Sequence, residues 1–243
     1  MVRLKSLSFL ILLLSISFCA NADLAQEGYI PWHWQASACA NCALQIVPIV
    51  ASDYNHDVYV FLNSLTSHKT ELLELYKING QDYNLLAWMA VGILGQESQF
   101  FRSERYKIKE SVPLLITLAK KIKAFSEGDK NISANSRGPT QIKVVPKSIA
   151  EFYNIKASDL SDPEKSAIAT MGFLIESLKE LRTRIRVHNL DYISESNIVD
   201  YLPYIYFGAS GRLTVRTATP ETNIYVKEMK RNMSYFKVYE KSE

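Results

Sequence analysis

Apolar residues recur at intervals of three and four along most of the chain, a spacing typical of helices rather than strands. Glycine is sparse, with 9 residues in 243, so the sequence has few of the residues that tight turns prefer. The pattern therefore predicts an all-α, or mainly α, fold. A short apolar run at residues 57–62 fits a strand as well as a helix. The expected helices include residues 57–77, 82–97, 109–126, 140–153, 195–207 and 220–236.

The clearest helix is predicted to begin near Ser161. Ser161 and Glu164 have the spacing of a capping box, and Pro163 suits a first helical turn. The apolar residues that follow form one stripe, which predicts a helix packed into the core. The stripe contains Ile168, Met171, Leu174, Ile175, Leu178, Leu181 and Ile185.

The first 22 residues have the pattern of a secretory signal peptide. Arg3 and Lys5 precede an apolar run at residues 7–18, and Ala20-Asn21-Ala22 resembles a cleavage site. No later segment reaches the roughly 18 apolar residues of a membrane span, so we expect no integral membrane segment in the mature chain. The expected location is the periplasm or the cell exterior.

Composition and length narrow the class of protein. Removing residues 1–22 leaves 26 Lys and Arg against 25 Asp and Glu, and such a neutral balance does not favour nucleic acid as a partner. The remaining length suits one main domain. We expect this domain at residues 80–236, after a helical N-terminal extension at residues 23–79.

The extension contains a Cys-x-x-Cys pair, Cys39 and Cys42. A short disulfide is the favoured interpretation in an exported chain. A haem attachment would need His where Ala43 stands, and a thioredoxin-like site would need a βαβ setting. The four His lack metal-ligand spacing, so the sequence implies neither a metal nor an organic cofactor.

Glu97 follows twelve uncharged residues at the end of a predicted helix. On that helix it would neighbour Ala90, Ile93 and Leu94. An apolar wall and the negative end of the helix dipole both disfavour a charged carboxylate, so we expect the pKa of Glu97 to be raised. A protonated carboxyl group near neutral pH is what glycosidic bond cleavage needs as its general acid. The alternative is a paired, structural glutamate.

Two later segments hold further candidate groups. Gly138 lies in a turn, and the amide of Gln141 can both donate and accept hydrogen bonds to a sugar. Tyr206 precedes a turn of small residues, from which its hydroxyl can reach a carboxyl group or a substrate oxygen. The first pattern also occurs in ordinary loop-to-helix junctions, and a tyrosine in the second can instead serve only for packing.

Taken in order, these segments resemble the soluble lytic transglycosylase domain of the lysozyme-like superfamily. Glu97-Ser98 is similar to its Glu-Ser pair at a helix end, and residues 136–142 to its Gly-Leu-Met-Gln turn. Residues 204–212 are similar to its Ala-Tyr-Asn-Ala-Gly segment, and residues 221–226 to its Glu-Thr-x-x-Tyr-Val helix.

The resemblance implies a lysozyme-like catalytic domain and assigns roles within it. Glu97 would be the sole general acid and base, with Ser98, Gln141 and Tyr206 binding substrate and Tyr206 also supporting Glu97. The implied partner is a peptidoglycan glycan strand, cut between N-acetylmuramic acid (MurNAc) and N-acetylglucosamine (GlcNAc). The muramic C6 hydroxyl closes a 1,6-anhydro ring, so no second carboxylate is needed.

Two departures from the family pattern leave alternatives open. Pro139-Thr140 replaces Leu-Met in the turn, and Phe207 replaces Asn after the tyrosine. One alternative is an inverting hydrolase of the lysozyme type, which needs a second carboxylate across the cleft. The other is a glycan-binding module with altered catalysis. Candidates for the second carboxylate are Glu104, Glu110, Glu127 and Asp129.

Overall fold

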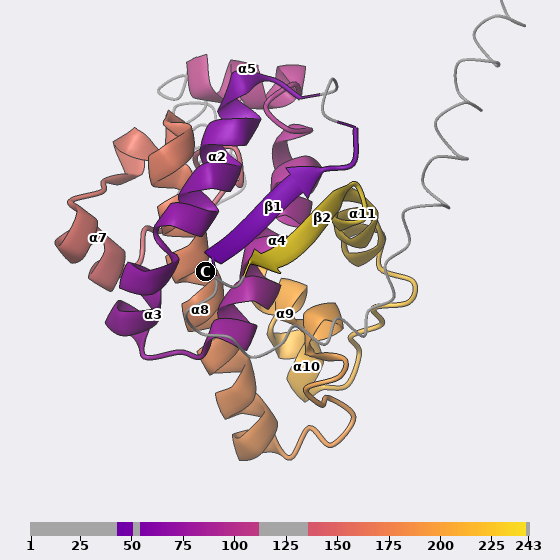
Figure 1. Ribbon diagram of the computed structural model, residues 1–243. Coiled ribbons are helices and arrows are strands. Elements are labelled where there is room, and N and C mark those ends of the chain that lie inside the picture. The colour runs from indigo at the N-terminus through magenta and orange to yellow at the C-terminus, as the bar shows by residue number, and fades with distance from the viewer. Residues whose placement is uncertain (1–42, 51–53, 112–135, 242–243) are drawn as a thin grey trace, which may run out of the picture. The chain divides into compact units, whose positions relative to one another are not determined.

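The computed structural model describes residues 43–50, 54–111 and 136–241. Residues 43–241 fall in one compact unit, which extends over Gln35–Glu243 (Figure 1). The predicted signal peptide, Cys39 and Cys42 lie outside the described residues, as does most of the helix expected at residues 109–126. Among the residues that are described, no helix is long and apolar enough to span a membrane.

The predicted all-α fold is confirmed for this part of the chain, with one small sheet added. Strands β1 (Ala43–Pro48) and β2 (Phe236–Lys241) pair antiparallel, with Pro48 opposite Phe236. The 3-10 helix η2 (Ala157–Ser161) precedes α8. The α-helices are α2 (His56–Ser67), α3 (Lys69–Tyr76), α4 (Gly80–Ser98), α5 (Glu104–Ser111), α7 (Lys147–Tyr153), α8 (Pro163–His188), α9 (Ile198–Tyr206), α10 (Gly211–Thr214) and α11 (Ile224–Met233).

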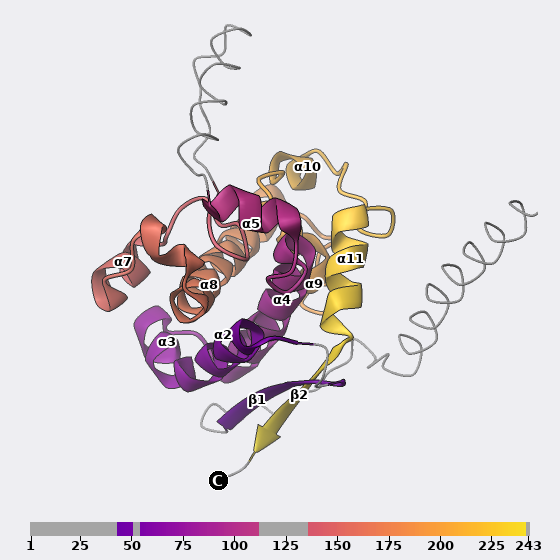
Figure 2. The same ribbon diagram turned by 90° about the horizontal axis from the view of Figure 1, so that it is seen from above.

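Helix α4 is the central helix of the described fold. It packs against α8 and α11, which lie on either side of it in Figure 2. Most of its residues are buried on every side, as expected for a helix without a polar face. Asn79 caps its N-terminus by accepting a hydrogen bond from the Asp82 amide at 2.7 Å. Gln99 ends it in the left-handed conformation.

Gly92 lets α11 pack close to α4. A Cβ atom at this position would lie 2.5 Å from the Met233 side chain and 2.7 Å from the Met229 carbonyl oxygen. Both contacts are too short for any side chain, so the two helices can approach this closely only at glycine. The close packing brings the start of α11 beside the end of α4.

Several predicted helix ends are corrected by the structure. Asp162, rather than Ser161, caps α8, because its side chain accepts from the Lys165 amide at 3.0 Å. The helix expected at 140–153 begins only at Lys147, since Pro146 disfavours a helical conformation in the residue before it. The ambiguous run at 57–62 is helical.

The segment expected as one helix at 57–77 divides into α2 and α3 at His68. Helix α2 packs against α8 and β1, and α3 contacts α4 and α8. The structure therefore places residues 56–76, which we expected in an N-terminal extension, in the same compact unit as the main domain.

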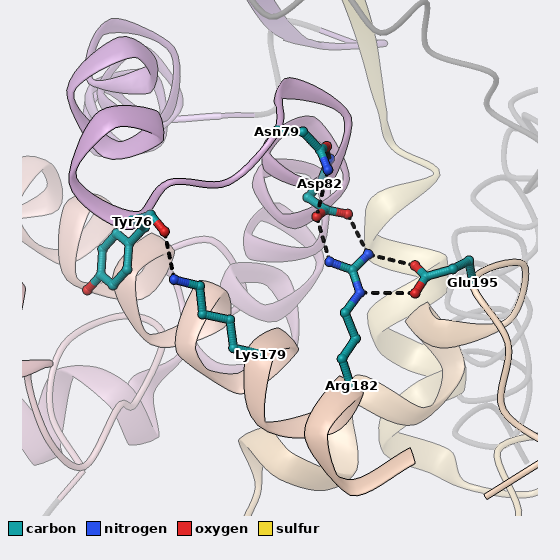
Figure 3. A network of polar contacts seen from close by, with 6 residues as sticks. All are labelled: Tyr76, Asn79, Asp82, Lys179, Arg182 and Glu195. Carbon is teal, nitrogen blue, oxygen red and sulfur yellow. Dashed lines mark hydrogen bonds and ion pairs between the residues drawn. The ribbon is translucent and has the colours of Figure 1, made fainter. Parts of the chain in front are cut away.

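A polar network fixes the first turn of α4 to α8 (Figure 3). The Arg182 guanidinium donates to both carboxylate oxygens of Asp82, at 2.6 and 2.8 Å, and to both of Glu195, at 3.0 and 2.6 Å. These hydrogen bonds raise the pKa of Arg182 above its usual value. Nearby, the Lys179 ammonium donates to the Tyr76 carbonyl at 2.6 Å. These two separate sets of contacts join α4 and α3, respectively, to α8.

Candidate active site

Glu97 lies one residue before the end of α4 and is half-buried between two cavities. The larger cavity, of about 380 Å³, is lined by Arg105, Tyr106 and Tyr225 among others. The smaller cavity, of about 180 Å³, includes Tyr206 and Phe207. Glu97 and Gln141 line both cavities, so the cavities meet at these two side chains.

The Tyr225 hydroxyl donates a hydrogen bond to Glu97 Oε1 at 2.9 Å. Burial and the nearby Glu97 charge raise the pKa of Tyr225 well above its usual value, so the phenol keeps the proton it donates. Sequence reasoning assigned no role to Tyr225, although the residue belongs to the Glu-Thr-x-x-Tyr-Val pattern. Tyr225 is a residue that the structure adds to the candidate site.

Hydrogen bonds to the buried Tyr204 hydroxyl hold the start of α11, which carries Tyr225. Asn223 caps this helix by accepting from the Val226 amide at 3.3 Å, and its Nδ2 donates to the Tyr204 hydroxyl at 3.2 Å. The same hydroxyl accepts from the Thr219 amide at 3.0 Å, and the Tyr204 side chain is fully buried. The start of α11 is thus fixed to α9.

From the resemblance we expected the Tyr206 hydroxyl to support Glu97. In the structure it donates instead to the Thr140 carbonyl oxygen. A phenol has one proton to donate, so the hydrogen bond to Glu97 comes from Tyr225 instead. Tyr206 is still close enough for the Glu97 charge, together with burial, to raise its pKa well above the usual value. Its hydroxyl anchors the turn that carries Gln141.

That turn holds the Gln141 amide where the cavities meet. Gln141 Nε2 donates to the Gly138 carbonyl at 2.7 Å, and Ser136 Oγ donates to Gln141 Oε1 at 3.1 Å. Gly138 has a φ of +72°, and a Cβ there would lie 2.4 Å from the Leu160 carbonyl oxygen. Only glycine fits, which fixes the turn against η2. The structure therefore brings the predicted residues Glu97 and Gln141 together.

Ser98, predicted to bind substrate, is fully buried and lines neither cavity. Its Oγ donates to the Leu94 carbonyl at 2.8 Å and accepts from the Phe101 amide at 3.2 Å. It thereby stabilises an unusual turn, in which Gln99, Phe100 and Phe101 have φ values of 50°, 56° and 66°. Left-handed residues of this kind cost about 1–3 kcal/mol each. Ser98 is a positioning residue for the end of α4.

The two candidates for a second carboxylate that the structure describes, Glu104 and Glu110, line neither cavity. Glu104 pairs with Lys107 at 3.1 Å, and its side chain is 81% exposed. Glu110 Oε1 accepts from the Gly138 amide at 3.0 Å. Neither side chain lines the two cavities. Glu127 and Asp129 lie outside the described residues.

The site is suited to proton transfer on a polar ligand that spans both cavities. It combines one carboxyl group, one phenol that donates to it and one amide held nearby. In the part of the chain that is described, no three His, Cys, Asp or Glu side chains group as metal ligands. Comparisons with protein-family models, curated proteins and solved structures found no match.

Proposed function

We propose that this protein is a peptidoglycan lytic transglycosylase in which Glu97 is the single general acid and base. The observation that carries the proposal is the position of Glu97 where two cavities meet. Gln141 lines the same two cavities, and the Tyr225 hydroxyl donates a hydrogen bond to Glu97. The signal-peptide pattern of residues 1–22 supports action in the periplasm or outside the cell.

In the proposed reaction a glycan strand lies across both cavities, with a MurNAc–GlcNAc bond over Glu97. Glu97 gives its proton to the glycosidic oxygen as the bond from MurNAc C1 to that oxygen breaks. The resulting carboxylate takes the proton of the C6 hydroxyl of the same MurNAc, and the C6 oxygen bonds to C1. The products are a 1,6-anhydro end and a GlcNAc hydroxyl, and Glu97 is protonated again.

The neighbouring residues support each stage of this reaction. Tyr225 donates to Oε1 of Glu97 and so stabilises the carboxylate that the first proton transfer leaves. Gln141 offers amide hydrogen bonds at the bond to be cut. Phe173 and Phe207 line the smaller cavity and present apolar ring surface to a sugar. Intramolecular attack by the C6 hydroxyl needs no second carboxylate.

The decisive experiment is digestion of purified murein sacculi by the wild type, Glu97→Gln and Glu104→Gln, with the products analysed by mass. Glu104→Gln is a matched control, because it makes the same chemical change in an exposed residue seven positions away. We expect anhydro-muropeptides from the wild type and the control. The cleavage rate of Glu97→Gln should be lower by about 10²–10⁴-fold or more.

Other results separate the alternatives. Reducing ends in place of anhydro ends would mean a lysozyme-type hydrolase. Binding to sacculi without turnover, unaffected by Glu97→Gln, would mean a glycan-binding module. Equal digestion by the wild type and Glu97→Gln would remove Glu97 from the mechanism.

A further inference from the structure

A basic side chain lines each of the two cavities that meet at Glu97. Lys143 lines the smaller cavity and Arg105 the larger. Within the described ranges, neither side chain forms an ion pair or a side-chain hydrogen bond, and both residues are exposed. Other basic residues nearby are paired, such as Lys107 with Glu104 at 3.1 Å and Lys147 with Glu151 at 3.6 Å.

Lys143 is placed by the turn that also places Gln141. It follows the buried Ile142, whose carbonyl accepts from the Arg137 amide at 2.8 Å and closes the turn. The ammonium group lies over Gly208, where a Cβ would be 3.9 Å from Nζ. This puts a positive charge at the smaller cavity, close to the aromatic rings of Tyr206 and Phe207.

A cation that lines a cavity is suited to bind an anion on the ligand. In a peptidoglycan strand the N-acetylated sugars are neutral, and the carboxylates are on the stem peptides attached to MurNAc. Every second sugar carries a stem, so a bound strand presents carboxylates on both sides of the bond that is cut. The two cations likewise belong to different cavities, and Glu97 lines both of these.

We propose that Lys143 and Arg105 bind stem-peptide carboxylates and make the protein select peptide-bearing glycan strands over strands without that negative charge. The inference rests on the proposed function, since it takes a glycan strand as the ligand. It adds to that function the part of the substrate that is recognised. Lys143 and Arg105 are then specificity residues, while Glu97 performs the proton transfers.

The test measures binding in a Glu97→Gln background, so that it does not depend on turnover. The probes are a soluble tetrasaccharide with two stem peptides, and the same compound with its carboxylates converted to amides. Calorimetry at low ionic strength gives both dissociation constants. Lys143→Gln and Arg105→Gln are compared with Lys147→Gln, an exposed lysine on α7 that lines neither cavity.

We expect amidation of the ligand to raise Kd about tenfold. Lys143→Gln should raise Kd for the carboxylate ligand by about threefold to tenfold and leave the amidated ligand unchanged. Arg105→Gln should also raise Kd for the carboxylate ligand. Lys147→Gln should leave Kd for both ligands unchanged. Salt should reduce the preference, because it screens exposed charges.

Equal Kd values for the two ligands, or an equal effect of Lys143→Gln on both, would overturn the inference, as would failure of both ligands to bind. Digestion of sacculi by the wild type tests the enzymatic proposal separately. A carboxylate preference without any cleavage would uphold charge selection and reject the transglycosylase. Cleavage to anhydro-muropeptides with no such preference would uphold the transglycosylase and reject charge selection.

Discussion

The two ends of α4 each hold a carboxylate, in opposite surroundings. At the first turn, Asp82 is 8% exposed, and Arg182 donates to both of its oxygens (Figure 3). Asn79 Nδ2 donates to the same side chain at 3.1 Å. Near the last turn, Glu97 accepts from the phenol of Tyr225 and lines two cavities.

The helix itself makes the two ends unequal. Its dipole favours negative charge at the N-terminus, where Asp82 lies, and opposes it at the C-terminus, where Glu97 lies. Asp82 is thus stabilised as an anion and is used for packing α4 on α8. The dipole does not favour a charged Glu97, and this side chain lines two cavities where a ligand can bind. One end of the helix holds the fold, and the other is suited to proton transfer.

The sharpest test of this division is a change at the Glu97 end. Glu97→Gln should lower the cleavage rate by about 10²–10⁴-fold or more, because the amide cannot act as an acid. The free energy of unfolding should change by less than about 1 kcal/mol, since Gln keeps the shape and an oxygen for Tyr225. Muropeptide analysis and urea unfolding measure the two effects. A large loss of stability would make Glu97 a structural residue.

The matching change at the other end is Asp82→Asn. It removes the ion pair but leaves Arg182 paired with Glu195, so unfolding should become easier by about 1–3 kcal/mol. The lower figures are favoured because Arg182 is partly exposed. Cleavage per folded molecule should stay near wild type. Glu195→Gln, at an exposed residue, should cost less than about 1 kcal/mol. Lost activity with full stability in Asp82→Asn would contradict the division.

Local patterns predicted the central parts of the fold. The apolar stripe of residues 168–185 identified α8, and a run of twelve uncharged residues identified α4 and placed Glu97 at its end. The sheet was not predicted, since β1 and β2 lie at opposite ends of the described chain and neither is long enough to show a strand pattern alone. The break at His68 has no glycine or proline to mark it.

Within the site, the burial of Ser98 could have been predicted from the sequence, but the hydrogen bond from Tyr225 could not. Adjacent helical residues point about 100° apart, so Ser98 faces the side of Leu94 and Val91, and all three side chains are fully buried. A Glu97 that faces a cleft therefore requires a Ser98 that faces the core. The Tyr225 hydrogen bond instead depends on where α11 packs, which Gly92 and Tyr204 decide through tertiary contacts.

The Tyr225 hydrogen bond offers the next test. Tyr225→Phe removes the donor to Glu97 and should lower the cleavage rate by about tenfold, the value of one charged hydrogen bond. Tyr206→Phe removes a donor to the Thr140 carbonyl and should act mainly on stability. Steady-state rates and urea unfolding of both variants separate the roles. A larger rate effect from Tyr206→Phe would restore the assignment made from the sequence.

The smallest expected effect lies at alkaline pH and again separates the two ends of α4. The pKa of Tyr225 is raised in the folded protein, so below about pH 10 both states keep the proton and stability is unaffected. Above that pH the unfolded phenol ionises first, and stability falls as pH rises. Arg182, whose pKa is also raised, stays charged throughout this range, so the Asp82 end should not change. Between about pH 9 and about pH 10.5, the free energy of unfolding of Tyr225→Phe should therefore fall by about 0.5–1 kcal/mol less than that of the wild type. Urea unfolding at the two pH values measures this difference. Equal losses would mean that Tyr225 is already open to solvent.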